Sequence, residues 1–248
     1  MRRELKYIVR EADRERLRAR IMPAVDVDAH AAGDIPSYTV RSVYYDTPGL
    51  RDYSEKASGD EVRRKVRVRA YDAPRSGPVF LEVKRKHGPA VWKDRAALEA
   101  STAAALLRGA GVAEAPESER VAAGRFLFRL RAEHRRPCLL VTYDREPLVG
   151  RLDPSLRITF DRRLRVSPFP DARTDLGGLY REPTEFVLPG RLILEVKFDR
   201  VYPSWLRPIQ AEFGLERQAL SKYGMGMDLV IARTPWRFGR GAVTALAR

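Results

Sequence analysis

Charged residues recur at every second position in five short segments of the chain. Successive side chains of a β-strand point to opposite faces, so each segment would gather its charges on one face. These sets are Glu4 and Lys6; Lys65, Arg67 and Arg69; Glu82, Lys84 and Lys86; Arg157, Thr159, Asp161 and Arg163; and Glu195 and Lys197. Rows of this kind suit a multiply charged anion, because arginine binds phosphate oxygens in pairs and lysine supplies point charges.

Apolar residues fill most of the alternate positions of the same segments, such as Val66, Val68 and Leu194. One solvated, charged face is usual for a single antiparallel strand. Five such strands, with helices between them that need an apolar surface to cover, favour a sheet closed with its charges inward. The pattern therefore predicts a tunnel lined by lysine and arginine, which needs an anionic ligand to offset the repulsion between its cations.

Four carboxylates interrupt the basic rows: Glu4, Glu82, Asp161 and Glu195. Each would either neutralise neighbouring cations or hold Mg²⁺ or Mn²⁺ that bridges phosphate oxygens. Glu195 ranks first as a metal ligand. Its alternative role is an ion pair with a neighbouring lysine or arginine.

The elements that must position these residues follow from hydrophobic periodicity and turn signals. Strands are predicted at residues 4–9, 38–46, 63–71, 79–86, 138–145, 156–165 and 192–198. Helices are predicted at residues 11–21, 94–108, 117–134, 203–213 and 221–232. Residues 167–190 read as a long surface connection or an irregular hairpin. The predicted fold class is α+β, an antiparallel β-barrel tunnel with flanking helices.

Composition narrows the class of protein. The 248 residues are 44% hydrophobic and 32% charged, which excludes a disordered chain and a membrane-embedded one. One cysteine, Cys138, and three histidines exclude a disulfide scaffold and a Cys/His zinc site. Because the N-terminus lacks an apolar signal segment, we expect a cytoplasmic location. We expect a single domain at residues 1–234 and a basic tail at residues 235–248.

The net charge of +14 favours polyanionic partners. Nucleic acid is the less favoured one, because the aromatic residues fall mostly at core positions of strands and no base-stacking motif is present. We therefore expect no nucleic-acid partner. The sequence does not predict an oligomeric state.

Seven segments together resemble the VTC domain, the polyphosphate polymerase branch of the CYTH-like triphosphate tunnel metalloenzymes. They are Glu4–Tyr7, Ser42–Pro48, Lys65–Arg69, Leu81–Lys84, Arg157–Asp161, Leu194–Phe198 and Ser221–Tyr223. Each segment alone is a weak signal, whereas their order and joint presence are specific. The resemblance extends from residue 4 to about residue 232.

The resemblance implies a tunnel enzyme that transfers the γ-phosphate of ATP to a growing polyphosphate chain with Mn²⁺, or Mg²⁺, as cofactor. It implies ATP, inorganic polyphosphate, tripolyphosphate or pyrophosphate as ligands. By position, the family's phosphate-binding basic residues correspond to Lys6, Arg67, Arg69, Lys84, Arg145, Arg157, Lys197 and Lys222. Glu195 corresponds to the metal-binding glutamate, and Ser221 and Tyr223 accompany Lys222.

One departure from the wider superfamily bears on the activity. Its hydrolytic and cyclase branches open with Glu-x-Glu-x-Lys, whereas Arg2 stands here at the first of those positions. The missing carboxylate favours the polymerase branch. A metal-dependent inorganic triphosphatase and a non-catalytic polyphosphate-binding module remain the alternatives. Because the chain lacks the membrane helices and SPX domain of eukaryotic relatives, any coupling to a membrane would need a separate membrane protein.

Overall fold

The computed structural model describes residues 2–31, 36–71, 77–88, 90–170 and 176–234. Most of the strands in this part are long and antiparallel. They are β1 (Arg2–Arg10), β2 (Val25–Val27), β3 (Tyr38–Asp46), β4 (Val62–Tyr71), β5 (Val79–His87), β6 (Ala90–Leu98), β7 (Arg136–Gly150), β8 (Arg157–Pro168), β9 (Glu185–Phe186) and β10 (Arg191–Asp199). The predicted tail at residues 235–248 lies outside the described residues.

Six α-helices accompany the strands in the described part of the chain. They are α1 (Arg14–Ile21), α2 (Arg51–Ala57), α3 (Ala100–Arg108), α4 (Arg120–Ala132), α5 (Leu206–Glu212) and α6 (Lys222–Arg233). Short 3-10 turns precede α1 at Glu11–Asp13 and α4 at Glu117–Glu119. None of the described helices is long and apolar enough to cross a membrane.

The strands form one antiparallel sheet in the order β1-β10-β8-β7-β3-β4-β5-β6, with β2 paired to β7 and β9 paired to β8. The predicted antiparallel α+β class is confirmed. Among the described residues the order has two ends, β1 and β6, so these pairings are those of an open sheet. The enclosure of a lumen stays a prediction.

The chain divides into two compact units. The single domain expected at residues 1–234 stays a prediction. Unit 1 consists of residues up to Thr39, Tyr143–Leu164 and Leu188–Leu220. Unit 2 consists of Val40–Thr142, Arg165–Val187 and the residues from Ser221 onward. The long strands β7 and β8 each contribute one end to either unit.

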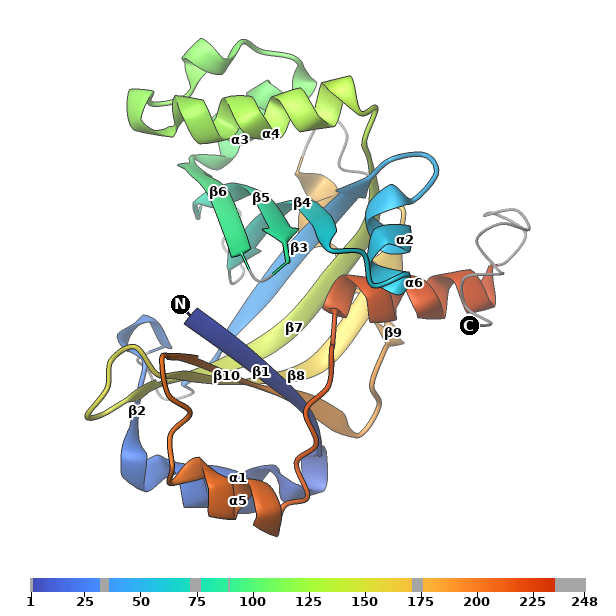
Figure 1. Cartoon of the computed structure of the whole chain (residues 1–248). Coiled ribbons are helices and arrows are strands. Elements are labelled where there is room, and N and C mark those ends of the chain that lie inside the picture. The colour runs from blue at the N-terminus through green and yellow to red at the C-terminus, as the bar shows by residue number, and fades with distance from the viewer. Residues whose placement is uncertain (1, 32–35, 72–76, 89, 171–175, 235–248) are drawn as a thin grey trace. The chain divides into compact units, whose positions relative to one another are not determined.

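The core of unit 1 lies between α1, α5 and the sheet formed by β1, β10 and β8 (Figure 1). Leu17 of α1 and Leu206 of α5 pack with Tyr7, Leu194 and other apolar residues of these strands. The apolar positions of the alternating pattern thus face helices, as the sequence predicts. The other face carries the charges.

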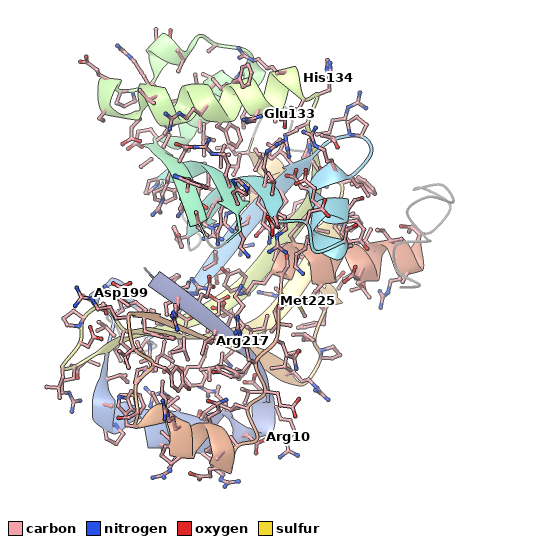
Figure 2. All side chains as sticks on the ribbon, viewed as in Figure 1. Arg10, Glu133, His134, Asp199, Arg217 and Met225 are labelled. Atoms are coloured by element: carbon pink, nitrogen blue, oxygen red, sulfur yellow. The ribbon has the colours of Figure 1, made fainter. Side chains whose placement is uncertain are left out.

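Unit 2 repeats this arrangement, with α3 and α4 beside β5 and β6 (Figure 1). Leu106 of α3 and Phe126 of α4 are fully buried against Val68 and Leu81 of the strands. Just after α4, Glu133 (Figure 2) accepts a hydrogen bond of 2.7 Å from Arg129 of the helix. Helices therefore cover the apolar face of the sheet in both units.

The predicted helix at residues 94–108 is wrong over its first five residues. Asp94–Leu98 belong to β6, which pairs with β5 along its whole length, and α3 begins only at Ala100. Alanine-rich composition favours a helix, but Ala96 and Leu98 alternate with polar residues and are buried on the apolar face. Tertiary pairing overrides the helix propensity of these alanines.

Other differences are smaller. Strands β2 and β9 and helix α2 were not predicted, and each is seven residues or shorter. The predicted helix at residues 203–213 begins at Leu206, and the one at residues 11–21 becomes α-helical at Arg14. In the segment 167–190, β9 returns along β8, so the irregular-hairpin interpretation is the better one.

Candidate functional site

The strand register in unit 2 places the charges of three strands on one face. Arg67 of β4 lies opposite Glu82 of β5, which in turn lies opposite Arg95 of β6. The neighbouring row on this face consists of three lysines, Lys65, Lys84 and Lys93. Directly paired residues of adjacent strands share a face, so the basic rows predicted for β4 and β5 are extended onto β6.

Glu82 is the centre of this face and is almost completely buried. Arg67 Nε donates to Oε2 at 2.6 Å, and Lys93 Nζ lies 2.7 Å from Oε1. Arg95 Nε is 3.5 Å from Oε1, and Arg69 Nε is 4.0 Å from Oε2. These five residues are called the Glu82 cluster. Burial alone would raise the pKa of Glu82, but the surrounding cations hold it well below its usual range.

The Glu82 cluster carries more positive than negative charge, since four cations surround one carboxylate. Burial lowers the pKa of Lys93, and the like charges of Arg67 and Arg95 add to this effect. Guanidinium and ammonium groups gathered on one face can bind the oxygens of an anion through several charge-assisted hydrogen bonds. The arrangement therefore suits an anion with several oxygens, such as a phosphate chain.

The start of α6 contacts one lysine of this face, Lys65. Ser221 caps the helix, and its Oγ also accepts a hydrogen bond from Lys65 Nζ at 2.8 Å. Tyr223 is buried, and its hydroxyl donates to Asp46 Oδ2 at 2.6 Å. Tyr223 thus fixes α6 against the end of β3. The phosphate-binding roles of Ser221, Lys222 and Tyr223 stay predictions.

A second charged face lies in unit 1 around Glu195 of β10. Its side chain is only 4% exposed and has three cations close by. Lys6 Nζ lies 3.5 Å from Oε1, whereas Lys197 Nζ and Arg145 Nη2 lie 3.2 Å and 3.5 Å from Oε2. The structure therefore brings together four residues of unit 1 that the sequence singled out.

Two further carboxylates balance these cations. Arg145 holds buried Asp161 through two hydrogen bonds of 2.6 Å and 2.7 Å. Glu4 Oε1 is 3.4 Å from Lys6 Nζ and 3.8 Å from Lys197 Nζ. With Glu195 these residues form the Glu195 cluster, in which three cations face three carboxylates. Burial would lower the pKa of Arg145, but Asp161 and other partners raise it.

Arg157 lies on the edge of this arrangement. It is opposite Lys197 in the register, yet its guanidinium forms an ion pair with Asp28 and its side chain is 40% exposed. Arg157 therefore has a counter-charge of its own. Its predicted role in binding phosphate is untested by this geometry.

The residues around Glu195 allow a test of whether a divalent cation fits. No group of three or more His, Cys, Asp or Glu side chains converges within the described part of the chain. Glu195 does offer a hard carboxylate oxygen, and the buried hydroxyl of Thr159, opposite it in the register, has no hydrogen-bond partner among the residues that the structure describes. Mg²⁺ and similar ions are commonly held by one or two carboxylates together with substrate phosphates. The chain thus fits a metal shared with a phosphate ligand.

Lys93 and Arg95 are the functional candidates that the sequence analysis missed, because residues 94–108 were assigned to a helix. A signal was present in the printed sequence. Lys93 and Arg95 alternate with Asp94 and Ala96, and the segment follows directly after a strand whose own charges alternate. A hairpin would have placed both cations beside Glu82.

Comparison with known families identifies the class of protein. The model of the VTC domain matches residues 1–231, so the chain belongs to the VTC domain family. The resemblance predicted from seven short segments is confirmed. A search of curated proteins found no match.

Solved structures similar to this chain include three proteins. The PH1819 protein of Pyrococcus horikoshii OT3 has a TM-score of 0.45 and 13% identity, covering 94% of this chain and 99% of that one. A putative adenylyl cyclase of Hippeastrum, described as having a dominant triphosphatase activity, has a TM-score of 0.43 and 14% identity, covering 94% and 96%. A chain of the Mediator head module of Schizosaccharomyces pombe has a TM-score of 0.38 and 11% identity, covering 94% of this chain and 93% of that one.

Proposed function

We propose that this VTC domain protein is a polyphosphate polymerase, which transfers the γ-phosphate of ATP to the end of an inorganic polyphosphate chain. The single observation that carries the proposal is the Glu82 cluster. Four cations around one buried carboxylate form a face that is suited to an anion, and phosphate chains supply several charged oxygens at short intervals. Membership of the VTC domain family supports the same substrate class.

In this proposal the basic residues of unit 2 bind and orient a phosphate chain. Arg67 and Arg69 offer guanidinium forks, and Lys84 and Lys93 offer point charges on the same face. Positioning and neutralisation of phosphate oxygens provide most of the catalysis in phosphoryl transfer. Lys222 at the start of α6 adds a further cation next to Ser221 and Tyr223.

In unit 1, Glu195 would hold Mn²⁺ or Mg²⁺, with Lys6, Arg145 and Lys197 around it and Arg157 nearby. When bound, such an ion neutralises charge on phosphate oxygens as a Lewis acid. A terminal oxygen of the acceptor chain attacks the γ-phosphorus of ATP and forms a new P–O bond. The bond between the γ-phosphorus and the β–γ bridging oxygen breaks, and ADP leaves. Because the acceptor oxygen is already ionised, no protein base is required.

Incubation of the purified protein with ATP and Mn²⁺, followed by a gel stained for polyphosphate, tests this function. A ladder of chains is the expected result. Glu195→Gln is the matched control, and it should yield no ladder if the activity belongs to this chain. Free phosphate without a ladder would overturn the proposal in favour of a triphosphatase. Neither product would favour a polyphosphate-binding module.

A further inference from the structure

Tyr44 of β3 carries a hydroxyl group on the same face as the Glu82 cluster. It lies opposite Arg67 in the register and is only 5% exposed. Arg67 Nη1 donates to the Tyr44 hydroxyl oxygen at 3.0 Å. Among the described residues, the Tyr44 hydroxyl forms only this hydrogen bond, and its oxygen is the acceptor. The phenolic proton therefore remains available for an acceptor outside this described part of the chain, such as a bound ligand.

The Tyr44 ring is held firmly in place. It stacks on the ring of Tyr223 with a centroid distance of 4.9 Å and an interplanar angle of 20°. The Tyr223 hydroxyl is anchored on Asp46, whose carboxylate also accepts hydrogen bonds from the main-chain N–H groups of Asp52 and Tyr53. A ring fixed in this way presents its hydroxyl at a defined position, which is what a preorganised ligand contact requires.

The electrostatic surroundings make the Tyr44 hydroxyl a stronger donor than an ordinary phenol. Burial alone would raise the pKa of Tyr44, but Arg67, Arg69 and Lys222 outweigh burial and lower it. Among the described residues, the charged and titratable groups around Tyr44 include Arg67 and Arg69 of β4, Lys222 and Tyr223 of α6, and Cys138 of β7. Arg67 in turn holds Glu82 of β5. An acidified donor beside two arginines is suited to an anionic oxygen.

We propose that Tyr44 is a phosphate-contacting residue, whose hydroxyl is held by Arg67 and donates its proton to an oxygen of the phosphate chain bound at the Glu82 cluster. The inference deepens the proposed function and depends on its phosphate-binding part. It does not depend on whether the bound phosphate is transferred or hydrolysed. Tyr44 would add a directional contact to a face otherwise made of flexible cations.

The first test is the affinity for tripolyphosphate, measured by titration calorimetry at pH 7 without metal. Tyr44→Phe keeps the ring and its stack on Tyr223, and it should weaken binding about tenfold. Tyr53→Phe is the matched control. Tyr53 is also buried in unit 2, but its hydroxyl already donates to Asp228 at 2.8 Å, so loss of that hydroxyl should leave the affinity unchanged.

The second test separates a direct contact from an effect through Arg67. A phenolate cannot donate a hydrogen bond, so tripolyphosphate should bind the protonated form of Tyr44 and raise its pKa. At alkaline pH the free protein absorbs at 295 nm through its phenolates, and the contribution of Tyr44 is the difference between wild type and Tyr44→Phe. Saturation with tripolyphosphate should therefore remove this contribution from the wild-type absorbance. Affinity should correspondingly fall as the pH rises through the pKa of Tyr44 in the free protein.

The outcomes separate this inference from the proposed function. If Tyr44→Phe binds as tightly as wild type, or if the phenolate band survives saturation, Tyr44 makes no direct contact and the inference is overturned. A polyphosphate ladder could still form in that case, and the polymerase proposal would stand. If wild type does not bind tripolyphosphate at all, both proposals are overturned.

Discussion

The two charged faces of this protein are built alike but are charged differently. In each, alternating strands place a buried glutamate among basic residues, with the apolar positions packed against helices. The Glu82 cluster has four cations for one carboxylate, whereas the Glu195 cluster has three cations for three carboxylates. The first has a surplus of positive charge, and the second is balanced.

Because of this difference, we expect the two faces to bind different ligands, and this expectation is called the division between the two faces. A face with surplus positive charge is stabilised when an anion binds, while a balanced face that includes a buried carboxylate can also accept a cation. Strand alternation alone would not distinguish the two faces. The distinction comes from the cross-strand partners, because Glu82 has cations from β4 and β6, whereas Glu195 shares Arg145 with Asp161.

The largest effect is expected from neutralising Glu195. Glu195→Gln keeps the shape of the side chain but removes the charge that a hard divalent cation requires, so metal-dependent turnover of ATP should fall about 100-fold or more. Glu212→Gln is a suitable control, since Glu212 lies on α5 of the same unit and pairs there with Arg20. Wild-type turnover by Glu195→Gln at saturating ATP and Mn²⁺ would show that Glu195 is only an ion-pair partner.

The next largest effect is expected from the Glu82 cluster. Arg67→Ala removes a guanidinium that the structure holds beside Glu82, so metal-free affinity for tripolyphosphate should fall roughly 10- to 100-fold. Arg125→Ala also removes one positive charge from unit 2, but Arg125 is 57% exposed and pairs with Asp94. Calorimetry should show little change for Arg125→Ala. Equal losses would mean that the net charge of +14, and not this cluster, binds the anion.

Acid should reveal the low pKa of Glu82 as a loss of stability. Because the pKa is depressed in the folded state, the contribution of Glu82 is complete above the unfolded value of about 4.3 and declines as the pH falls toward the folded value. Between pH 5 and pH 3 the free-energy difference between wild type and Glu82→Gln should therefore shrink by roughly 1.5–2 kcal/mol.

Urea unfolding of both variants at the two pH values measures this change. Glu212→Gln serves as the exposed-carboxylate control. A wild-type advantage over Glu82→Gln that is the same at pH 5 and pH 3 would contradict the depressed pKa.

Arg157→Ala should have the smallest effect. Its side chain is partly exposed and already paired with Asp28, so the affinity for tripolyphosphate should fall about fivefold at most. The same calorimetric titration measures it beside Arg67→Ala. A loss as large as that of Arg67→Ala would show that Arg157 leaves Asp28 for the ligand.

The strands that carry the two faces could largely be predicted from the sequence, because period-two alternation at Lys65–Arg69 and Glu195–Lys197 marks both the strand and its charged face. The contribution of β6 could not be predicted as easily. Alanine favours helices and does not mark the buried face of a strand as valine or leucine does. Only the pairing of β6 with β5 therefore reveals that Lys93 and Arg95 face Glu82.

Alternation also could not tell which cations each carboxylate holds. The pairing of Arg157 with Asp28 joins two residues that are far apart in sequence, and no local pattern marks it. No local pattern marks Tyr44 either, because its position in the strand is typical of a core aromatic residue. Its hydroxyl gains significance only through Arg67 on the next strand and Tyr223 on α6.

The most direct test of the division between the two faces is a calorimetric titration of wild type, Arg67→Ala and Glu195→Gln with tripolyphosphate, each with and without Mn²⁺. Without metal, Arg67→Ala should bind weakly, and Glu195→Gln should bind at least as tightly as wild type. Mn²⁺ should strengthen binding by wild type and leave Glu195→Gln unchanged. Equal metal-free losses in the two variants, or an undiminished Mn²⁺ effect in Glu195→Gln, would contradict this division.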